Sequence, residues 1–188
     1  MGFEDQKKTA LSQIEIFDRS KKGSLDENIR GLVEKINAHP DFYTTSSCGG
    51  RIIVYEKDEG SKKHETRWLY CTHGDLDRKK LRESINDCTA DVWFAVEAVI
   101  IHLVARTKEQ AAQVIASAQQ SGLKRGGAIS FSKRFVLELV GVDEFSTIII
   151  KNGKKVVDDQ YLELLMDEAE SKLKKNAQRI ALLSKFFD

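Results

Sequence analysis

The chain has 188 residues, of which 41% are hydrophobic and 31% are charged. This length and composition predict one compact domain over residues 1–188 and exclude a disordered protein. The 30 lysines and arginines nearly balance the 29 aspartates and glutamates, so the formal net charge is only +1. That balance argues against a histone-like nucleic-acid binder, and any contact with RNA must come from local basic patches.

Two further properties of the sequence bear on where in the cell the protein is found. No apolar run approaches the roughly 20 residues that a membrane-spanning helix needs, and residues 1–5 do not resemble the start of a signal peptide. We therefore expect a cytoplasmic protein with no membrane partner. The three cysteines, Cys48, Cys71 and Cys88, are an odd number in a chain long enough to fold without disulfides, which predicts reduced thiols.

The first elements in chain order are two helices. Apolar residues at helical spacing predict an amphipathic helix that ends near Asp18, and a polar loop over residues 19–23 follows it. Ser24-Leu25-Asp26-Glu27 has the pattern of a capping box at the start of a second helix, which Pro40 ends. The apolar residues of this helix form one stripe and are expected to be buried: Ile29, Leu32, Val33 and Ile36.

Strands dominate the middle of the chain. Residues 42–45 and 51–55 flank the turn-rich residues 46–50, which predicts a hairpin with an exposed loop. A third strand over residues 68–72 runs into His73-Gly74, and a short basic helix is expected from about Asp77 to Asn86. Residues 92–106 are apolar on both alternating faces, which predicts one continuous central strand.

The last part of the sequence alternates a helix, several strands and a second helix. Thr107 and Gln110 predict another capping box, and Gly122 is placed to end that helix. Strands are expected near residues 128–131, 134–142, 145–151 and 154–157, with Asn152-Gly153 as a type I′ turn. A long helix over residues 159–187 follows, with an apolar face that includes Leu173, Ala177 and Ile180. The predicted fold class is α+β, one domain whose largely antiparallel sheet is flanked by helices.

Several common site types are absent from the sequence. No Gly-x-Gly-x-x-Gly opens a helix after a strand, and strands do not alternate regularly with helices, so a Rossmann-type methyltransferase fold is not supported. No phosphate-binding loop of the Gly-x-x-x-x-Gly-Lys-Ser/Thr type occurs. Cys71 and His73 are too close in sequence for a usual zinc ligand pair, and no metal is predicted.

The first candidate for chemistry is the loop from Asp18 to Asp26, which gathers acids, bases and hydroxyls around Gly23. The start of a helix offers amide donors to an anion, and Lys21 and Lys22 suit a phosphate backbone. Helix capping with solvated charges would account for the same residues.

The second candidate is the segment from Thr45 to Ile52. Its small hydroxyl side chains and its two glycines allow backbone amides to approach a bound group. Arg51 has a planar guanidinium that suits a carboxylate or a phosphate. An ordinary hairpin loop with a surface arginine remains the alternative.

The third candidate combines three titratable residues. Glu97 falls on one face of the predicted central strand among Trp93, Ala95, Val99 and Ile101, where an unpaired carboxylate would be costly. His102 lies on the other face, where the pattern favours a structural, hydrogen-bonded histidine at a strand end over a functional one. His73 follows a strand in a His-Gly turn, a frequent place for functional side chains.

Basic clusters could together face RNA, although each alone is compatible with a solvated surface. They are Lys62-Lys63-His64, Arg78-Lys79-Lys80-Arg82, Lys124-Arg125 and Lys133-Arg134. Trp68, Trp93 and Tyr70 are expected in the core rather than as base-stacking platforms.

These segments, in this order, resemble the tRNA wybutosine-synthesising protein 3 family over almost the whole chain. Asp18-x-Ser20-x-Lys22-Gly23-x-x-Asp26 resembles the family's opening motif, Thr45-Ser46-Ser47-Cys48-Gly49-Gly50-Arg51 its Ser-Ser-Cys-Ser-Gly-Arg loop, and Trp68 to His73 its Trp-to-His strand. Glu97 and His102 fall in a segment similar to its Glu-Pro-Phe-x-x-His stretch, and residues 122–129 and 176–183 complete the resemblance. Three positions depart from the family: Gly49 replaces a usual serine, Ala98 a usual proline, and Gly127 stands where a Ser-Gly pair is common.

The resemblance implies an enzyme that transfers a methyl group from S-adenosylmethionine to N4 of a tricyclic wyosine or wybutosine precursor. The target would be guanosine 37, in the anticodon loop of tRNA-Phe. A chain of this length resembles the archaeal form of the family. The oligomeric state is not predicted.

The implied site has two sets of residues. Asp18 and Glu97 are candidate general bases, and His73 completes the catalytic set. The residues expected to bind substrate or methyl donor are Ser20, Lys22, Gly23, Asp26, Ser46, Ser47, Cys48, Gly50, Arg51 and His102.

Two other functions remain open at this point. One is a non-catalytic tRNA-binding module that assists another modification enzyme. The other is a small hydrolase that uses Cys48, which the sequence disfavours because no histidine lies nearby to activate the thiol.

Overall fold

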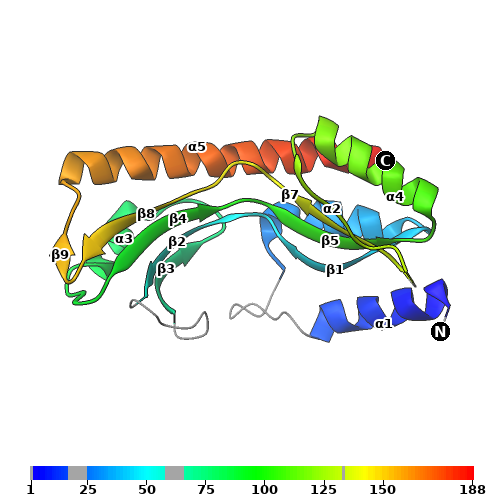
Figure 1. Cartoon of the computed structure of the whole chain (residues 1–188), viewed down its shortest axis with the longest axis horizontal. Coiled ribbons are helices and arrows are strands. Elements are labelled where there is room, and N and C mark those ends of the chain that lie inside the picture. The colour runs from blue at the N-terminus through cyan, green and yellow to red at the C-terminus, as the bar shows by residue number, and fades with distance from the viewer. Residues whose placement is uncertain (1, 17–24, 58–65, 133) are drawn as a thin grey trace. The chain divides into compact units, whose positions relative to one another are not determined.

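The described residues of the chain fall into two compact units (Figure 1). The computed structural model describes residues 2–16, 25–57, 66–132 and 134–188. The first unit takes its residues from segments 1–49, 99–142 and 176–188, and the second unit from 50–98 and 143–175. The chain therefore passes between the units at Gly49–Gly50, before Val99, after Val142 and after Lys175. The single domain expected for residues 1–188 stays a prediction.

The first unit is built on a four-stranded antiparallel sheet with the strand order β1-β5-β7-β6. These strands are β1 (Phe42–Cys48), β5 (Ile100–Ala105), β7 (Phe135–Val140) and β6 (Arg125–Ser130). One face of the sheet packs in an apolar core with α2 (Glu27–Ala38), α4 (Lys108–Gln120) and the C-terminal end of α5 (Asp159–Ser184). Side chains of successive strand residues alternate between faces, so this core uses only one side of the sheet.

The opposite face of this sheet, which we call the outer face, carries α1 (Phe3–Ile16) near its β1 edge. The Phe3 ring packs edge-on against Tyr43, with 5.3 Å between ring centres. Arg106 fixes the start of this helix because its guanidinium stacks 4.2 Å from the centre of the Phe3 ring and pairs with Glu4. The hydrogen bonds that Arg106 donates to Glu4 and Asp41 raise its pKa, which keeps this anchor charged.

The second unit contains a five-stranded antiparallel sheet with the order β3-β2-β4-β8-β9. The strands are β2 (Arg51–Glu56), β3 (Arg67–Thr72), β4 (Val92–Glu97), β8 (Phe145–Lys151) and β9 (Lys154–Lys155). Its core joins this sheet to α3 (Arg78–Ser84) and to the first turns of α5, and a 3-10 helix, η2 (Lys185–Phe187), follows α5. The α+β class with antiparallel strands is confirmed: every strand pair among the described residues is antiparallel.

Local signals in the sequence predicted several elements correctly. The four-residue stripe of α2 is buried, and both hydrogen bonds of the Thr107–Gln110 capping box form at the start of α4. Gly122, with φ +90°, follows that helix in the left-handed conformation that favours glycine. Asn152 and Gly153 both have positive φ, as a type I′ turn between β8 and β9 requires.

Two predictions about strand pairing were wrong. Residues 42–48 and 51–56 are strands, but they do not form a hairpin: β1 pairs with β5 in one sheet and β2 pairs with β3 and β4 in the other. Residues 92–106 are not one strand, because Ala98 and Val99 separate β4 from β5. Both errors have one cause, since a buried strand that changes sheet has the same apolar pattern as a strand that continues.

Two helix details also differ from the predictions. The helix α2 begins after Asp26, two residues later than the capping pattern at Ser24 indicated. In α5 the polar residue Asn176 is fully buried, whereas the neighbouring Ala177, expected on the apolar face, is exposed. Counting apolar residues along a helix does not identify a polar residue that replaces one of them on the buried face.

Candidate functional site

The candidate residues belong to both units. Asp18, Ser20, Lys22 and Gly23 lie outside the described residues. In the first unit the structure describes Asp26, Ser46, Ser47, Cys48 and His102, and in the second unit Gly50, Arg51, His73 and Glu97.

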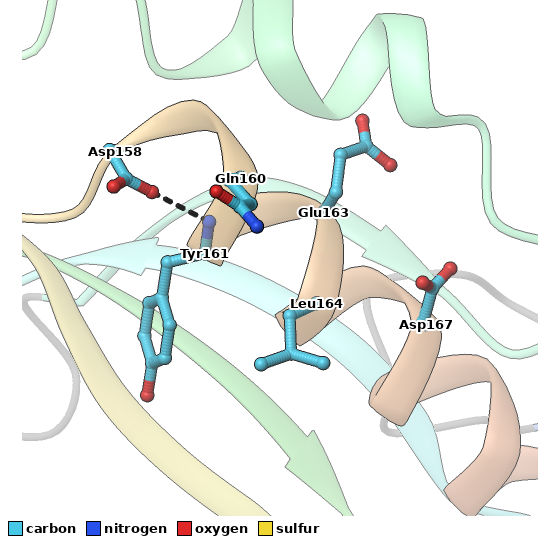
Figure 2. A pocket seen from close by; sticks show the side chains of 6 residues that line it. All are labelled: Asp158, Gln160, Tyr161, Glu163, Leu164 and Asp167. Atoms are coloured by element: carbon cyan, nitrogen blue, oxygen red, sulfur yellow. Dashed lines mark hydrogen bonds between the residues drawn. The ribbon is translucent and has the colours of Figure 1, made fainter.

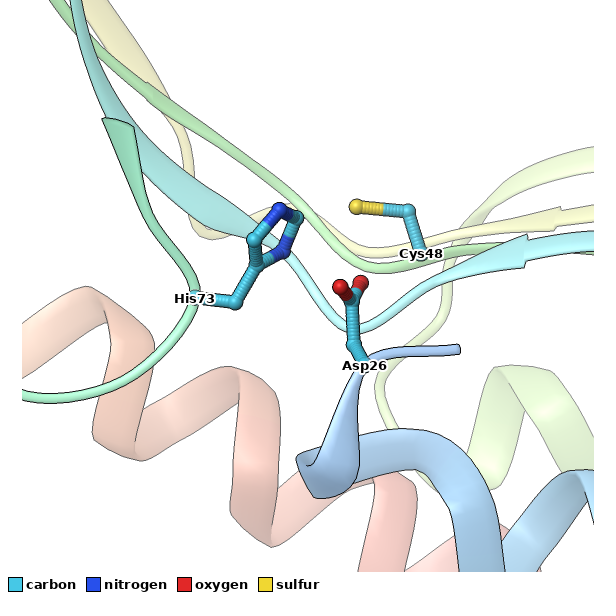
Figure 3. Close-up of side chains that lie close together, drawn as sticks. All are labelled: Asp26, Cys48 and His73. Atoms are coloured by element: carbon cyan, nitrogen blue, oxygen red, sulfur yellow. The ribbon is translucent and has the colours of Figure 1, made fainter. Parts of the chain in front are cut away.

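In the first unit, Asp26 and Cys48 are brought together by the end of β1 and the start of α2. The backbone N–H of Gly49 donates to Asp26 Oδ2 over 3.3 Å, and the Asp26 carboxylate lies within 4.8 Å of Cys48 Sγ. Figure 3 shows both side chains. A carboxylate, a thiol and the start of a helix thus converge from segments 22 residues apart in sequence.

The glycine that departs from the family pattern has a structural explanation. A Cβ atom on Gly49 would lie 2.1 Å from Oδ1 of Asn28, so Asn28 fills the space that a serine side chain at this position would need. The preceding hydroxyl, Ser47 Oγ, is buried and has no hydrogen-bond partner among the described residues. A buried hydroxyl usually has a partner, so the unsatisfied oxygen of Ser47 needs an explanation.

Three polar side chains form a hydrogen-bonded row across the outer face of the first unit's sheet. The strand register places Ser46 of β1 beside His102 of β5, and His102 beside Glu138 of β7. Ser46 Oγ lies 2.7 Å from His102 Nδ1, and His102 Nε2 lies 2.7 Å from Glu138 Oε2. We call these three residues the outer-face row. His102 is hydrogen-bonded through both ring nitrogens, so the structural interpretation of this residue and a functional one both remain open.

Glu138 was not among the predicted site residues. In sequence it is an acidic residue among apolar neighbours, Phe135 to Val140, and nothing local distinguishes it from a solvated residue on an alternating strand. Its place beside His102 is apparent only from the pairing of β7 with β5, which is a long-range contact.

In the second unit, Gly50 and His73 are joined by a hydrogen bond. His73 Nδ1 lies 3.2 Å from the carbonyl oxygen of Gly50, and His73 follows directly after β3. Gly50 has a φ of +88°, a conformation that side chains other than glycine rarely adopt. The imidazole is therefore held at the start of β2 by a backbone conformation that depends on glycine.

Arg51 and Glu97 form an ion pair at the adjoining ends of β2 and β4. Arg51 Nε donates to Glu97 Oε2 over 2.5 Å, and the guanidinium also stacks 4.4 Å from the centre of the Trp68 ring. The side chain of Glu97 is 47% exposed, so the prediction of a carboxylate buried among apolar residues was wrong. It rested on a continuous strand, whereas Glu97 is the last residue of β4. Trp68 is half-buried beneath the guanidinium rather than in the core.

The basic helix α3 directs its two arginines toward α5. Arg78 donates to Glu163 over 2.6 Å, to Asp167 over 2.7 Å and to Glu170 over 2.5 Å, and Arg82 pairs with Glu163 as well. We call these five residues the arginine cluster. The hydrogen bonds to Asp167, Glu163 and Glu170 raise the pKa of Arg78, and those from Arg82 and Arg78 lower the pKa of Glu163.

The arginine cluster changes the interpretation of α3 as an RNA-facing surface. Arg78 and Arg82 are neutralised by carboxylates of their own chain and are therefore poor candidates for phosphate contacts. A shallow pocket lies on α5 next to the cluster, and none of its lining residues was a site candidate (Figure 2). They are Asp158, Gln160, Tyr161, Glu163, Leu164 and Asp167.

Known proteins resemble this chain over its full length. Residues 5–188 match the family described as methyltransferase TYW3. A Pyrococcus horikoshii protein named tRNA(Phe) 7-((3-amino-3-carboxypropyl)-4-demethylwyosine(37)-N(4))-methyltransferase 1 is 31% identical, over 97% of this chain and 93% of its own length. The Methanocaldococcus jannaschii protein with the same name, apart from the final numeral, is 34% identical, over 93% of this chain and 91% of its own.

A solved structure agrees with the fold. The PH1069 protein from Pyrococcus horikoshii superposes with a TM-score of 0.91 at 30% identity, covering 100% of this chain and 96% of that one. Among the described residues, no helix is long and apolar enough to cross a membrane.

Proposed function

The chain belongs to the methyltransferase TYW3 family, and from this premise we propose that it methylates N4 of 7-(3-amino-3-carboxypropyl)-4-demethylwyosine at position 37 of tRNA(Phe). The observation that carries the proposal is the family match over residues 5–188, with relatives about 30% identical over nearly their whole length. We further propose S-adenosylmethionine as the methyl donor, the anticodon loop as the RNA partner and the cytoplasm as the location. Residues 1–188 would act as one domain.

Each unit carries its own proposed site residues. Asp26, Ser47, Cys48 and the outer-face row contribute from the first unit, and Gly50, Arg51 and His73 from the second. Asp18, Ser20, Lys22 and Gly23 join them on the basis of the sequence motif alone. Glu97 stays a candidate base, but without the apolar surroundings that first favoured it, and its ion pair with Arg51 suggests that it orients the guanidinium instead.

The residues of the first unit fit a polar ligand with an amino-acid group. Such a ligand needs hydrogen-bond partners at its ammonium and carboxylate ends, and the Asp26 carboxylate and the unpartnered Ser47 hydroxyl can supply them. S-adenosylmethionine supplies a methyl group on a positively charged sulfur. Asp26 would favour that positive charge, because a carboxylate attracts a cation at short range.

In the second unit, Arg51 is suited to the anionic part of the substrate. The name of the relatives' substrate includes an amino-carboxypropyl group, whose carboxylate matches a planar guanidinium. Arg51 is already oriented by Glu97 and Trp68, so little side-chain entropy is lost when a carboxylate or a phosphate binds.

The proposal is tested by transfer of radioactive methyl from S-adenosylmethionine to tRNA(Phe) that carries the 4-demethyl base. We expect incorporation into this tRNA and none into the same tRNA with the N4 methyl already present. Donor binding in calorimetry without transfer would identify the precursor as the wrong one. Transfer and donor binding both absent would leave a non-catalytic tRNA-binding module as the better account.

The role of Ser47 is tested with a matched pair of variants. Ser47→Ala is expected to weaken donor binding several-fold, because a ligand group loses its hydrogen-bond partner. Ser12→Ala, on the exposed side of α1, removes a hydroxyl from the same unit and should leave donor binding unchanged. Equal donor affinity in both variants would remove Ser47 from the site.

A further inference from the structure

The outer-face row has the geometry of a proton relay that ends in an accessible hydroxyl. His102 presents one nitrogen to a carboxylate and the other to a hydroxyl, both at 2.7 Å, and the three residues come from three neighbouring strands. Ser46 is exposed, whereas the side chains of His102 and Glu138 are only 24% and 34% exposed. The accessible end of the row is therefore the hydroxyl.

The carboxylate decides which nitrogen of His102 carries the proton. An ionised carboxylate only accepts hydrogen bonds, so Glu138 selects the tautomer with the hydrogen on Nε2. Nδ1 then has a free lone pair and accepts the hydroxyl hydrogen of Ser46. This arrangement makes Ser46 Oγ a better proton acceptor, because His102 Nδ1 can accept the proton of the Ser46 hydroxyl at the same time.

The strand register leaves space beside the row. The next position across the sheet after Glu138 is Gly127 of β6, which has no side chain, and a Cβ atom built there meets no atom within 4 Å. On the other side, a β-bulge in β1 between Thr44 and Ser46 turns Ser46 to the outer face, while Thr44 stays buried and bonded to Asn37. The bulge is what aligns the hydroxyl with His102.

We propose that this row removes the proton from the ring nitrogen that is methylated, with Ser46 in contact with the substrate and with His102 and Glu138 as positioning residues behind it. The inference rests on the proposed function. A ring nitrogen that lacks its methyl carries a hydrogen, which must leave when the methyl arrives. Moving this proton through a positioned side chain contributes about 10²- to 10⁴-fold in rate.

The step balances in atoms and charge. The nitrogen forms a bond to the methyl carbon as the carbon–sulfur bond breaks, and that electron pair stays on the sulfur, which becomes neutral. The N–H proton passes to Ser46 Oγ while the hydroxyl proton of Ser46 passes to His102 Nδ1. The imidazolium so formed is stabilised by Glu138 and later releases its proton to water.

The test compares two histidine variants of the full chain in the tRNA methylation assay. His102→Ala is expected to lower kcat about 100-fold with donor affinity unchanged. The cavity it leaves lies between Ser46 and Glu138 and is open to solvent, so added imidazole should restore part of the rate in proportion to its unprotonated form. His39→Ala, which removes a histidine at the end of α2 in the same unit, should keep the wild-type rate and respond to no imidazole.

A second variant keeps the proposal testable if His102→Ala fails to fold. Glu138→Gln keeps the shape of the side chain but loses the charge, and it should lower kcat with little change in KM. The relay is overturned if His102→Ala and Glu138→Gln both keep kcat within threefold of the wild type, or if their loss is in KM alone and imidazole restores nothing. Labelling of Ser46 by a fluorophosphonate would also overturn it, because the row would then activate a covalent nucleophile. A wild-type protein without methyl transfer would instead refute the proposed function.

Discussion

The outer-face row and the arginine cluster are both chains of short polar contacts, yet they differ in what a proton can do in them. In the arginine cluster two guanidinium groups face three carboxylates, and the hydrogen bonds to these carboxylates raise the pKa of Arg78 still further. In the outer-face row the central group is an imidazole, which can accept or donate, and the end group is an exposed hydroxyl. The first arrangement can hold α3 to α5 but cannot transfer a proton, whereas the second can transfer one.

This contrast separates stabilising from functional polar contacts without reference to how close the atoms are. Distances near 2.7 Å occur in both regions. What differs is whether a member can both accept and donate a hydrogen, as an imidazole can, and whether one end is accessible. The row therefore behaves as a functional unit and the cluster as a structural one.

The largest expected effect is that the losses in kcat caused by two substitutions in the row do not add in free energy. If the row acts as one unit, the double variant His102→Ala/Glu138→Gln should be no slower than His102→Ala alone, about 100-fold below the wild type. Steady-state kcat values of the four proteins in the cycle measure this. Glu109→Gln, on the exposed side of α4, serves as an unrelated acidic partner. Multiplicative losses in the double variant would contradict a shared role.

The next effect is on stability and belongs to the cluster. Arg78→Gln removes the hydrogen bonds to Glu163, Asp167 and Glu170 and should lower the free energy of unfolding by about 1.5 kcal/mol, after allowance for a side chain that is 35% exposed. The value of kcat should stay within twofold. Urea unfolding and the methylation assay measure the two quantities, and Lys79→Gln on the same helix is the exposed control. A tenfold loss of kcat with unchanged stability would assign the cluster to the site.

A helix cap in the first unit provides a smaller effect on stability. Thr107→Ala removes the side-chain hydrogen bond to the backbone N–H of Gln110 and should cost about 1 kcal/mol. The helix α4 packs on the core face of the same sheet, so the outer-face row should keep its rate. Thr107→Ser retains the cap and should behave as the wild type. Unfolding by urea distinguishes the two substitutions.

The smallest effect is a change in how stability depends on pH. Hydrogen bonds from Arg82 and then Arg78 lower the pKa of Glu163. A carboxyl group with a lowered folded pKa stabilises the fold above its unfolded pKa of about 4.3, and that contribution is lost as pH falls through the folded value. Arg82→Gln should therefore flatten the loss of stability below about pH 4.3 in urea titrations. An unchanged slope would show that Glu163 gains nothing from Arg82.

Much of the fold could be predicted from the sequence because local rules decide it. The stripe of α2, the Thr107–Gln110 cap and the Asn152-Gly153 turn each depend on residues within a few positions of one another. The points where the chain leaves one sheet and enters the other could not be predicted in the same way. The pattern of residues 92–106 is equally apolar whether the strand continues or, as here, changes sheet after Glu97.

The candidate site shows the same division. Ser46 and His102 were predicted from motifs, but their hydrogen bond depends on a bulge in β1 and on its pairing with β5. Glu138 was missed because only the register of β7 places it beside His102. Glu97 was interpreted wrongly for a related reason. It is exposed because it is the last residue of β4, and no residue in the sequence indicates that the strand ends there.

The most direct test of the account uses S-adenosylmethionine with a trideuterated methyl group and tRNA(Phe) that carries 7-(3-amino-3-carboxypropyl)-4-demethylwyosine. After incubation with the wild-type protein, the nucleoside at position 37 is isolated and fragmented in a mass spectrometer. The account predicts a gain of one trideuterated methyl on the tricyclic base at N4. An unchanged nucleoside, under conditions in which the Pyrococcus horikoshii relative converts the same tRNA, would contradict it.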